Sequence, residues 1–324
     1  MNNEGIPIPC RVHGLVRLPA ESTIVVDADE EVFLAYTRLS GFRTSDGTSA
    51  FRGLGQVDSR KDTLTVTFEL KAPSNAHDEP PTKRPRKYKT KIATETNIEV
   101  ELSQDTTSLR SRSGDTGSVL WQARRVTGIA LAQVLLQEHY YPVADRFLEP
   151  SSLRNAHVLE LGAGTGMLSV LLSPMVRRYT VTDIPALLPL IRKNVTLSFP
   201  EWPSPNARGS NITVEELDWV LLQLASSTAR EKYAPYARDD PPDLVLVIDC
   251  IYNPSLLQPL VDTIDYVSGS ETTVAMVSEL RAEDVIREFL EAWLRVPGWK
   301  IWSTGNSVLN VPYVLWIARK EASS

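Results

Sequence analysis

Three glycines separated by single residues follow a short apolar run near the middle of the chain. Residues 158–166 read VLELGAGTG, so glycines stand at 162, 164 and 166, and Glu160 stands two places before the first of them. Because glycine has no Cβ, such a loop lets the backbone approach a ligand closely. A strand, a glycine loop and a following helix are typical of sites that bind a nucleotide or a nucleoside.

The spacing of these glycines distinguishes between two kinds of cofactor. A dinucleotide site has the pattern G-x-G-x-x-G, and Met167 stands where its third glycine would be. The carboxylate of Glu160 would repel a pyrophosphate, whereas it would attract the ammonium group of an amino acid such as methionine, directly or through water. The pattern resembles the motif of seven-stranded methyltransferases, and we therefore expect it to bind S-adenosyl-L-methionine.

Acidic and aromatic residues follow the next apolar runs. Asp183 ends the run at 179–183, about 20 residues after the first glycine, where an acid accepts hydrogen bonds from ribose hydroxyls. A helix cap is the alternative role for Asp183. Asp218-Trp219 follows the run at 211–217, and an indole can stack on adenine while an aspartate accepts from its amino group. Trp219 as an ordinary core aromatic is the alternative.

Four motifs in this order resemble those of the family-16 protein-lysine methyltransferases. This family includes the fungal ribosomal lysine N-methyltransferase five group and the valosin-containing-protein lysine methyltransferase. The motifs are GSVLW at 117–121, ELGAGTG at 160–166, Asp218-Trp219, and DCIY at 249–252. The resemblance covers roughly residues 95–320. It implies S-adenosyl-L-methionine as the cofactor and a lysine of another protein as the acceptor, with a ribosomal or other cytosolic protein as the partner.

The resemblance also implies roles for individual residues. Asp249 and Tyr252 would be the catalytic residues on the acceptor side, because a carboxylate can orient an ammonium and an aromatic ring can contact it. Water can remove the proton that lysine must lose before it attacks, so neither residue has to be a general base. The alternative for Asp249 is a cap of a helix beginning near Pro254. The residues expected to bind the cofactor are Trp121, Glu160, Gly162, Ala163, Gly164, Gly166, Asp183, Asp218, Trp219 and Cys250.

Apolar runs alternate with helical stretches from about residue 118 onward, beginning with a predicted helix at 126–137. Such runs predict five parallel strands that helices cover on both faces, at 157–161, 179–183, 211–217, 243–249 and 272–278. Only a short polar loop joins the last two runs, 299–303 and 313–318, which predicts an antiparallel hairpin at one edge. The fold class is therefore α/β, a seven-stranded Rossmann-like methyltransferase sheet with a terminal antiparallel hairpin.

Residues 1–110 differ in pattern from residues 111–324, which predicts a small β-rich region in front of the cofactor-binding domain. This first region shows little helical periodicity. Apolar residues alternate at 62–70 and 97–102, which predicts two half-buried strands that pair. Residues 72–91 between them are rich in proline and charge, and we expect a disordered insertion there.

Charge and cysteine content limit the class of protein. The formal net charge is −6, which does not indicate general nucleic-acid binding. The basic cluster at 83–87 is most simply a solvated loop, with a nuclear import signal or an RNA patch as the alternatives. Two cysteines, Cys10 and Cys250, are too few for a disulfide framework and fit a reducing compartment. The histidines have no ligand spacing, so no metal site is expected at His13, His77, His139 or His157.

The remaining expectations concern location and competing functions. No apolar run approaches the roughly 18 residues of a membrane span, and the N-terminus lacks a signal-peptide pattern, so we expect a soluble protein. We also expect it to be a monomer in the cytoplasm, with the nucleus as a further location. A methyltransferase of the same fold that acts on a nucleic acid or a small molecule remains open, because the cofactor loop does not specify the acceptor. A catalytically inactive cofactor-binding module is the other alternative, against which the Asp249–Tyr252 pair argues.

Overall fold

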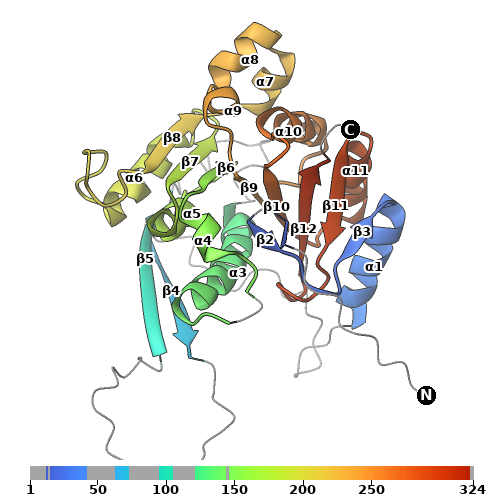
Figure 1. Ribbon diagram of the computed structural model, residues 1–324, viewed down its shortest axis with the longest axis horizontal. Coiled ribbons are helices and arrows are strands. Elements are labelled where there is room, and N and C mark those ends of the chain that lie inside the picture. The colour runs from blue at the N-terminus through green and yellow to red at the C-terminus, as the bar shows by residue number, and fades with distance from the viewer. Residues whose placement is uncertain are drawn as a thin grey trace, which may run out of the picture.

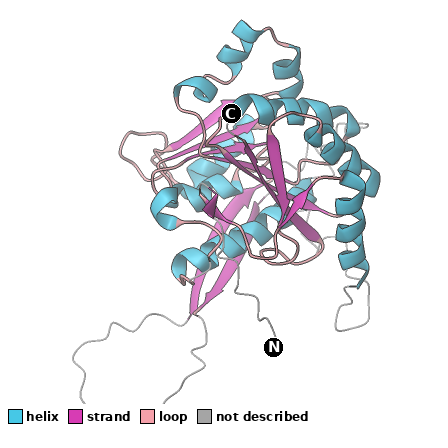
Figure 2. Ribbon diagram, turned by 45° about the vertical axis from the view of Figure 1, so that its right-hand side comes forward, coloured by secondary structure: helices cyan, strands magenta, loops and turns pink. Residues whose placement is uncertain are grey.

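A central sheet with helices on both of its faces forms the body of the protein (Figure 1, Figure 2). The computed structural model describes residues 12–13, 15–41, 63–72, 95–104, 121–143 and 146–321. The strand order of the sheet is β3-β11-β12-β10-β9-β6-β7-β8. Within the described ranges, none of the helices combines the length and the hydropathy that a membrane span requires.

Five neighbouring strands of this sheet are parallel. The pairs β8–β7, β7–β6, β6–β9 and β9–β10 all run in the same direction, which confirms the five parallel strands predicted from the apolar runs. Helices on both faces explain why the strand at 244–248 consists of apolar residues alone and why the strand at 273–279 contains the apolar run Val274–Val277. The strands are β6 (His157–Leu161), β7 (Arg178–Asp183), β8 (Ile212–Glu216), β9 (Leu244–Ile248) and β10 (Thr273–Glu279).

The antiparallel part of the sheet has one strand more than predicted. β11 (Trp299–Ser303) and β12 (Tyr313–Lys320) form the expected antiparallel hairpin, and β12 also pairs with β10. β3 (Thr23–Val25) pairs with the outer side of β11, with Ile24 opposite Trp302. The sheet therefore has eight strands, and the hairpin does not lie at its edge. A strand of three residues is too short to show an alternating pattern in the sequence.

Two hydrophobic clusters occupy the two faces of the sheet. Val158 and Leu159 are adjacent in β6 and belong to different clusters, as expected when successive side chains point to opposite faces. One face is covered by α3 (Trp121–Tyr140), α5 (Met167–Leu172) and α6 (Leu188–Ser198). The other is covered by α1 (Ala28–Gly41), α7 (Trp219–Leu224), α10 (Pro254–Val267) and α11 (Glu283–Leu294).

Short elements complete the described chain. β1 and β2 pair with each other antiparallel, and the remaining short helices lie in connections between strands. Their bounds are β1 (Val12–His13), β2 (Val16–Arg17), α4 (Pro150–Leu153), η1 (Ser173–Met175), α8 (Ser227–Tyr233) and α9 (Tyr236–Asp239).

A separate hairpin packs against the helices on one face. β4 (Thr63–Lys71) and β5 (Glu95–Ser103) pair antiparallel, which confirms the predicted pairing. Their buried side chains join the hydrophobic cluster that contains α3 and α5. Asn194 of α6 accepts a hydrogen bond from the Ser103 N–H at 2.7 Å, which attaches the end of β5 to α6. The predicted insertion at 72–91 lies, apart from Ala72, outside the described residues, and the division into two domains stays a prediction.

Helix α1 lies in the region that the sequence analysis described as β-rich and for which it identified no helix. Glu31 of α1 is buried, and its Oε1 accepts hydrogen bonds from the Ser303 hydroxyl at 2.7 Å and the Trp316 indole N–H at 3.0 Å. Phe33, by contrast, is exposed. Because a carboxylate faces the core and an aromatic ring faces outward, the apolar periodicity that usually reveals a helix is weak here.

Candidate active site

The glycine loop connects β6 to α5, as predicted. Gly162 follows the last residue of β6, and Gly166 precedes α5. Gly162 and Gly164 have φ angles of 63° and 62°, in the left-handed region that residues with a Cβ rarely adopt. The backbone conformation therefore accounts for two of the glycines that the sequence pattern identified.

Three of the predicted cofactor-binding residues meet at Gly162. A Cβ added to Gly162 would lie 3.0 Å from the Cys250 sulfur and 3.0 Å from a ring carbon of Trp219. The ends of β6, β8 and β9 thus converge, as the carboxyl ends of parallel strands do. A Cβ added to Gly164 would meet no atom of the described residues within 4 Å, so these residues leave that side of the loop open.

Asp183 holds the glycine loop from the end of β7. Its side chain is buried, and its Oδ2 accepts a hydrogen bond from the Gly164 N–H at 2.7 Å. Its Oδ1 accepts from the Ile184 N–H at 2.8 Å. The next helix, α6, begins only at Leu188, so the alternative that Asp183 caps a helix is wrong. Its expected contact with ribose stays a prediction.

Glu160 has a protein partner that sequence reasoning missed. The Tyr179 hydroxyl donates to its Oε2 at 2.9 Å, and both side chains are buried. Burial and the neighbouring carboxylate raise the pKa of Tyr179 well above its usual value, so the phenol keeps the proton that it donates. Tyr179 lies on the adjacent strand, and only the pairing of β6 with β7 brings the two residues together. Binding of an ammonium group by Glu160 stays a prediction.

Asp218 and Trp219 begin helix α7. Asp218 caps this helix, because its Oδ1 accepts from the Val220 N–H at 2.9 Å and the Leu221 N–H at 3.1 Å. Trp219 is buried, and its indole N–H has no acceptor among the described residues. A buried donor without a partner is costly, and a water or a ligand can supply the acceptor. The side chain of Trp121 lies outside the described residues.

Asp249 follows β9 and is part of an ionic cluster. Its backbone has a φ of 55° and its N–H donates to the Val277 carbonyl at 2.7 Å. Its carboxylate is 2% exposed and forms an ion pair with Arg281, whose Nε donates to Glu279 Oε2 at 2.9 Å. The sequence analysis did not identify Arg281 or Glu279, although Glu279 ends β10, the neighbour of β9 in the sheet, and Arg281 follows it.

Tyr252 lies between this cluster and helix α10. It is half-buried, and the helix begins two residues later at Pro254. Asn253 caps this helix, because its Oδ1 accepts from the Ser255 N–H at 3.1 Å. The alternative that Asp249 is the cap is therefore wrong.

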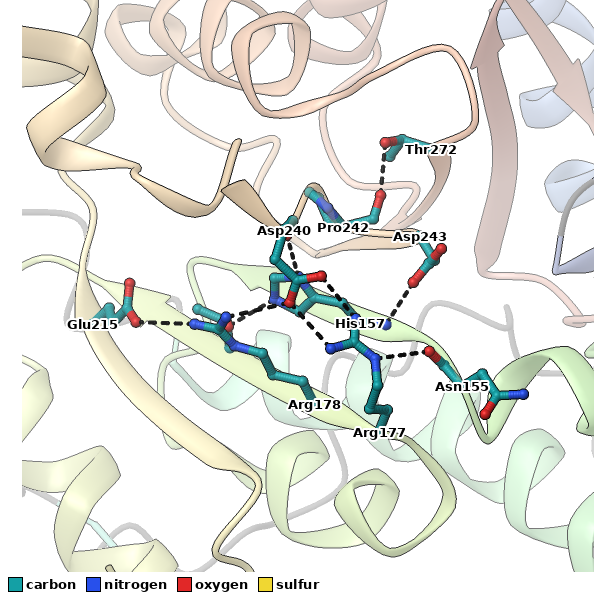
Figure 3. A network of polar contacts seen from close by, with 10 residues as sticks. Asn155, His157, Arg177, Arg178, Glu215, Asp240, Pro242, Asp243 and Thr272 are labelled. Atoms are coloured by element: carbon teal, nitrogen blue, oxygen red, sulfur yellow. Dashed lines mark hydrogen bonds and ion pairs between the residues drawn. The ribbon is translucent and has the colours of Figure 1, made fainter. Parts of the chain in front are cut away.

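The opposite ends of the strands carry a different polar network (Figure 3). His157 is fully buried at the start of β6, where its Nδ1–H donates to the Asp240 carbonyl at 2.7 Å and its Nε2 accepts from the Thr180 hydroxyl at 2.8 Å. Arg177 donates to the Asp240 carboxylate at 2.8 Å. Burial lowers the pKa of His157, and the network is structural in character. In the part of the chain that the structure describes, no three His, Cys, Asp or Glu residues are grouped so that they could hold a metal ion.

Comparison with known proteins assigns the family. A family model described as lysine methyltransferase matches residues 101–295, more than half of the chain. The chain belongs to the lysine methyltransferase family. Membership in this family implies S-adenosyl-L-methionine as the cofactor. The open side of the loop at Gly164 and the unpartnered indole N–H of Trp219 fit a ligand of this kind.

Several relatives share this part of the chain. The diaminohydroxyphosphoribosylamino-pyrimidine deaminase of Schizosaccharomyces pombe is 32% identical and aligns with 60% of this chain and 42% of its own length. The EEF1A lysine methyltransferase 3 of Xenopus tropicalis is 31% identical, over 41% of this chain and 51% of its own. The ribosomal lysine N-methyltransferase 5 of Eremothecium gossypii is 27% identical, over 59% and 71%. The chain thus spans about half the length of the first two.

Proposed function

We propose that this chain is an S-adenosyl-L-methionine-dependent protein-lysine N-methyltransferase. The observation that carries the proposal is the convergence of Gly162, Trp219 and Cys250 with Asp249 at the carboxyl ends of β6, β8 and β9. Ligands of open α/β sheets bind at this edge, where the strand order reverses. The family adds the acceptor class, because its description names lysine.

The proposed cofactor residues come from several elements at this edge. Asp183 would bind the ribose while it holds the glycine loop, and the ring of Trp219 would contact the adenine. Glu160 would hold the ammonium group directly or through water, beside the Tyr179 hydroxyl that donates to its Oε2. When bound, the cofactor supplies a methyl group attached to a sulfonium. The remaining proposed contacts are Trp121, Gly162, Ala163, Gly164, Gly166, Asp218 and Cys250.

The proposed role of the acceptor residues is to position a lysine. The neutral amine attacks the methyl carbon with its lone pair, while the carbon–sulfur bond breaks and its electrons stay on sulfur. Because lysine has a pKa near 10.4, it must first lose a proton, which goes to water. Asp249 would orient the entering ammonium and Tyr252 would line its path. Such positioning contributes a large part of the rate of a bimolecular displacement.

The test is transfer of a radiolabelled methyl group to proteins of a cell lysate. The wild type should label a protein band, and hydrolysis of that band should give methylated lysine. Gly162→Arg is the matched control, because a side chain there collides with Cys250 and Trp219. Label in RNA or in a small molecule would instead favour the corresponding methyltransferase, and cofactor binding without transfer to any acceptor would favour an inactive binding module.

We further propose a ribosomal or other cytosolic protein as the substrate, in line with the name of the Eremothecium gossypii relative. Fractionating the labelled lysate on a sucrose gradient checks this, because label outside ribosomal fractions would contradict the ribosomal part. We propose that the protein acts as a monomer in the cytoplasm, with entry into the nucleus as the alternative location. Light scattering and imaging of a fluorescent fusion, with and without the basic cluster at 83–87, test these two points.

A further inference from the structure

The carboxylate of Asp249 is held on both of its oxygens. Its Oδ1 accepts from the Glu279 N–H at 3.4 Å, and its Oδ2 pairs with the Arg281 guanidinium. At 2% exposure this carboxylate has almost no contact with water. A buried carboxylate that loses its cationic partner becomes strongly unfavourable in its ionised form. Arg281 therefore compensates the buried charge of Asp249.

Arg281 is itself fixed by a second carboxylate. Its Nε donates to Glu279 Oε2 at 2.9 Å, and Glu279 is only 10% exposed on its side chain. The planar guanidinium suits this arrangement, since it can donate in two directions at fixed angles, which a lysine ammonium does not. Arg281 thus bridges the ends of β9 and β10, with one carboxylate on each side.

The charge of this cluster fits an acceptor that arrives as a cation. A single arginine near the expected position of a lysine would repel it. Two carboxylates and one guanidinium together carry a net charge of about −1, so the cluster as a whole attracts an ammonium. Burial, together with Glu279 and Asp249, raises the pKa of the neighbouring Tyr313 to about 12, and this phenol stays neutral. The attraction therefore depends on all three charged side chains.

We infer that Arg281 is a positioning residue, which compensates the buried charge of the Asp249 carboxylate and holds it in a fixed orientation toward the acceptor lysine. This inference rests on the proposed lysine methyl transfer. Arg281 does not have to touch the substrate, and it acts through Asp249. Arg281 belongs to the acceptor side of the site. Its loss should therefore change the rate of methyl transfer and the pH dependence of that rate, while cofactor affinity is preserved.

The first experiment compares Arg281→Met with Arg281→Lys. Arg281→Met keeps the aliphatic stem and removes the charge, so we expect kcat to fall at least about tenfold. The acidic limb of the rate–pH profile should move to higher pH, which a purely structural role would not produce. Arg281→Lys should recover part of the rate and of the profile. Arg295→Met is the matched control: Arg295 is 73% exposed and pairs with Glu291 at the far end of α11, and its loss should leave the rate unchanged.

The second experiment tests whether Arg281 acts through Asp249. If it does, Arg281→Met combined with Asp249→Asn should transfer methyl groups no more slowly than Asp249→Asn alone. Multiplication of the two rate losses would overturn the inference, and so would a wild-type rate and pH profile in Arg281→Met.

The same cycle is measured on unfolding in urea, which requires no methyl transfer. Arg281→Met should destabilise the wild type clearly more than it destabilises the Asp249→Asn background, because Asp249 and Glu279 both lose their partner in the wild type, whereas only Glu279 does in the Asp249→Asn background. Equal destabilisation in both backgrounds would overturn the inference. If the wild type labels no protein, the proposed function fails while this unfolding cycle still decides whether Arg281 holds Asp249.

Discussion

The contrast between Gly162 and Gly164 gives a prediction that can be worked out from the structure. Both residues have nearly the same positive φ, 63° and 62°, so replacement by alanine imposes the same backbone strain of about 1–2 kcal/mol. Only at Gly162 would the new Cβ also press on neighbouring atoms, at 3.0 Å from Cys250 and from Trp219. Crowding of this kind in a packed interior costs about 1–3 kcal/mol.

Gly162→Ala should therefore lose about 2–5 kcal/mol of unfolding free energy, and Gly164→Ala only about 1–2 kcal/mol. Urea unfolding of both variants measures the difference, and the melting temperatures should differ by about 2–4 °C for each kcal/mol. A loss that is equal within about 0.5 kcal/mol would refute the reasoning, since it would mean that Gly162 does not pack against Trp219 and Cys250. Calorimetry with the cofactor gives a second comparison. Gly164→Ala should bind the cofactor more weakly than Gly162→Ala does, although its folding defect is milder, because the open side of the loop lies at Gly164.

Three further predictions concern the ribose contact, the buried histidine and the N-terminal helix. Asp183→Ala should lower the affinity for S-adenosyl-L-methionine by about 1.5–3 kcal/mol in calorimetry, and unchanged affinity in a folded variant would limit Asp183 to holding the loop. Burial lowers the pKa of His157 in the folded protein, so as pH falls the unfolded chain takes up this proton first. The contribution of neutral His157 to the free energy of unfolding is therefore fully present above about pH 6.5 and declines below it. Urea unfolding should show a smaller decline with falling pH for His157→Asn than for the wild type, and equal declines would contradict this account. Glu31→Leu leaves the Ser303 hydroxyl and the Trp316 indole N–H without their acceptor and should cost about 1–3 kcal/mol for each, whereas unfolding at the wild-type urea midpoint would show that these bonds contribute nothing net.

The parallel half of the sheet was predictable because its strands are buried on both faces. β9 consists of apolar residues alone, and β6 is apolar apart from His157 and Glu160. The glycine loop after β6 is a local pattern that needs no knowledge of the fold. The hairpin of β4 and β5 was predictable for a related reason, since one face of each strand is buried and apolar residues alternate.

The N-terminal additions to the sheet were not predictable in the same way. β3 has three residues, and α1 attaches to the sheet through the buried carboxylate of Glu31, so neither shows the periodicity that burial of apolar side chains produces. Their positions depend on pairing with β11 and β12, which lie almost at the other end of the chain.

The residues of the candidate site also differ in how far the sequence alone could predict them. Gly162, Asp183 and Asp249 stand at strand ends that the sequence reveals, so their meeting at one edge of the sheet could be predicted. Tyr179 and Arg281 belong to the site only through pairing between strands: Tyr179 contacts Glu160 across β6 and β7, and Arg281 contacts Asp249 across β9 and β10. No local pattern identifies such residues, because their role depends on the order of the strands.

The most direct test of the central claim is the rate of methyl transfer to protein lysine by Asp249→Asn. This substitution keeps the shape of the side chain and removes the charge that would orient the ammonium. We predict a rate at least about tenfold below that of the wild type, equivalent to about 1.4 kcal/mol, with cofactor affinity close to the wild-type value. Tyr252→Ala should also slow transfer, through the loss of its ring. Wild-type rates in both variants would contradict the proposed acceptor site.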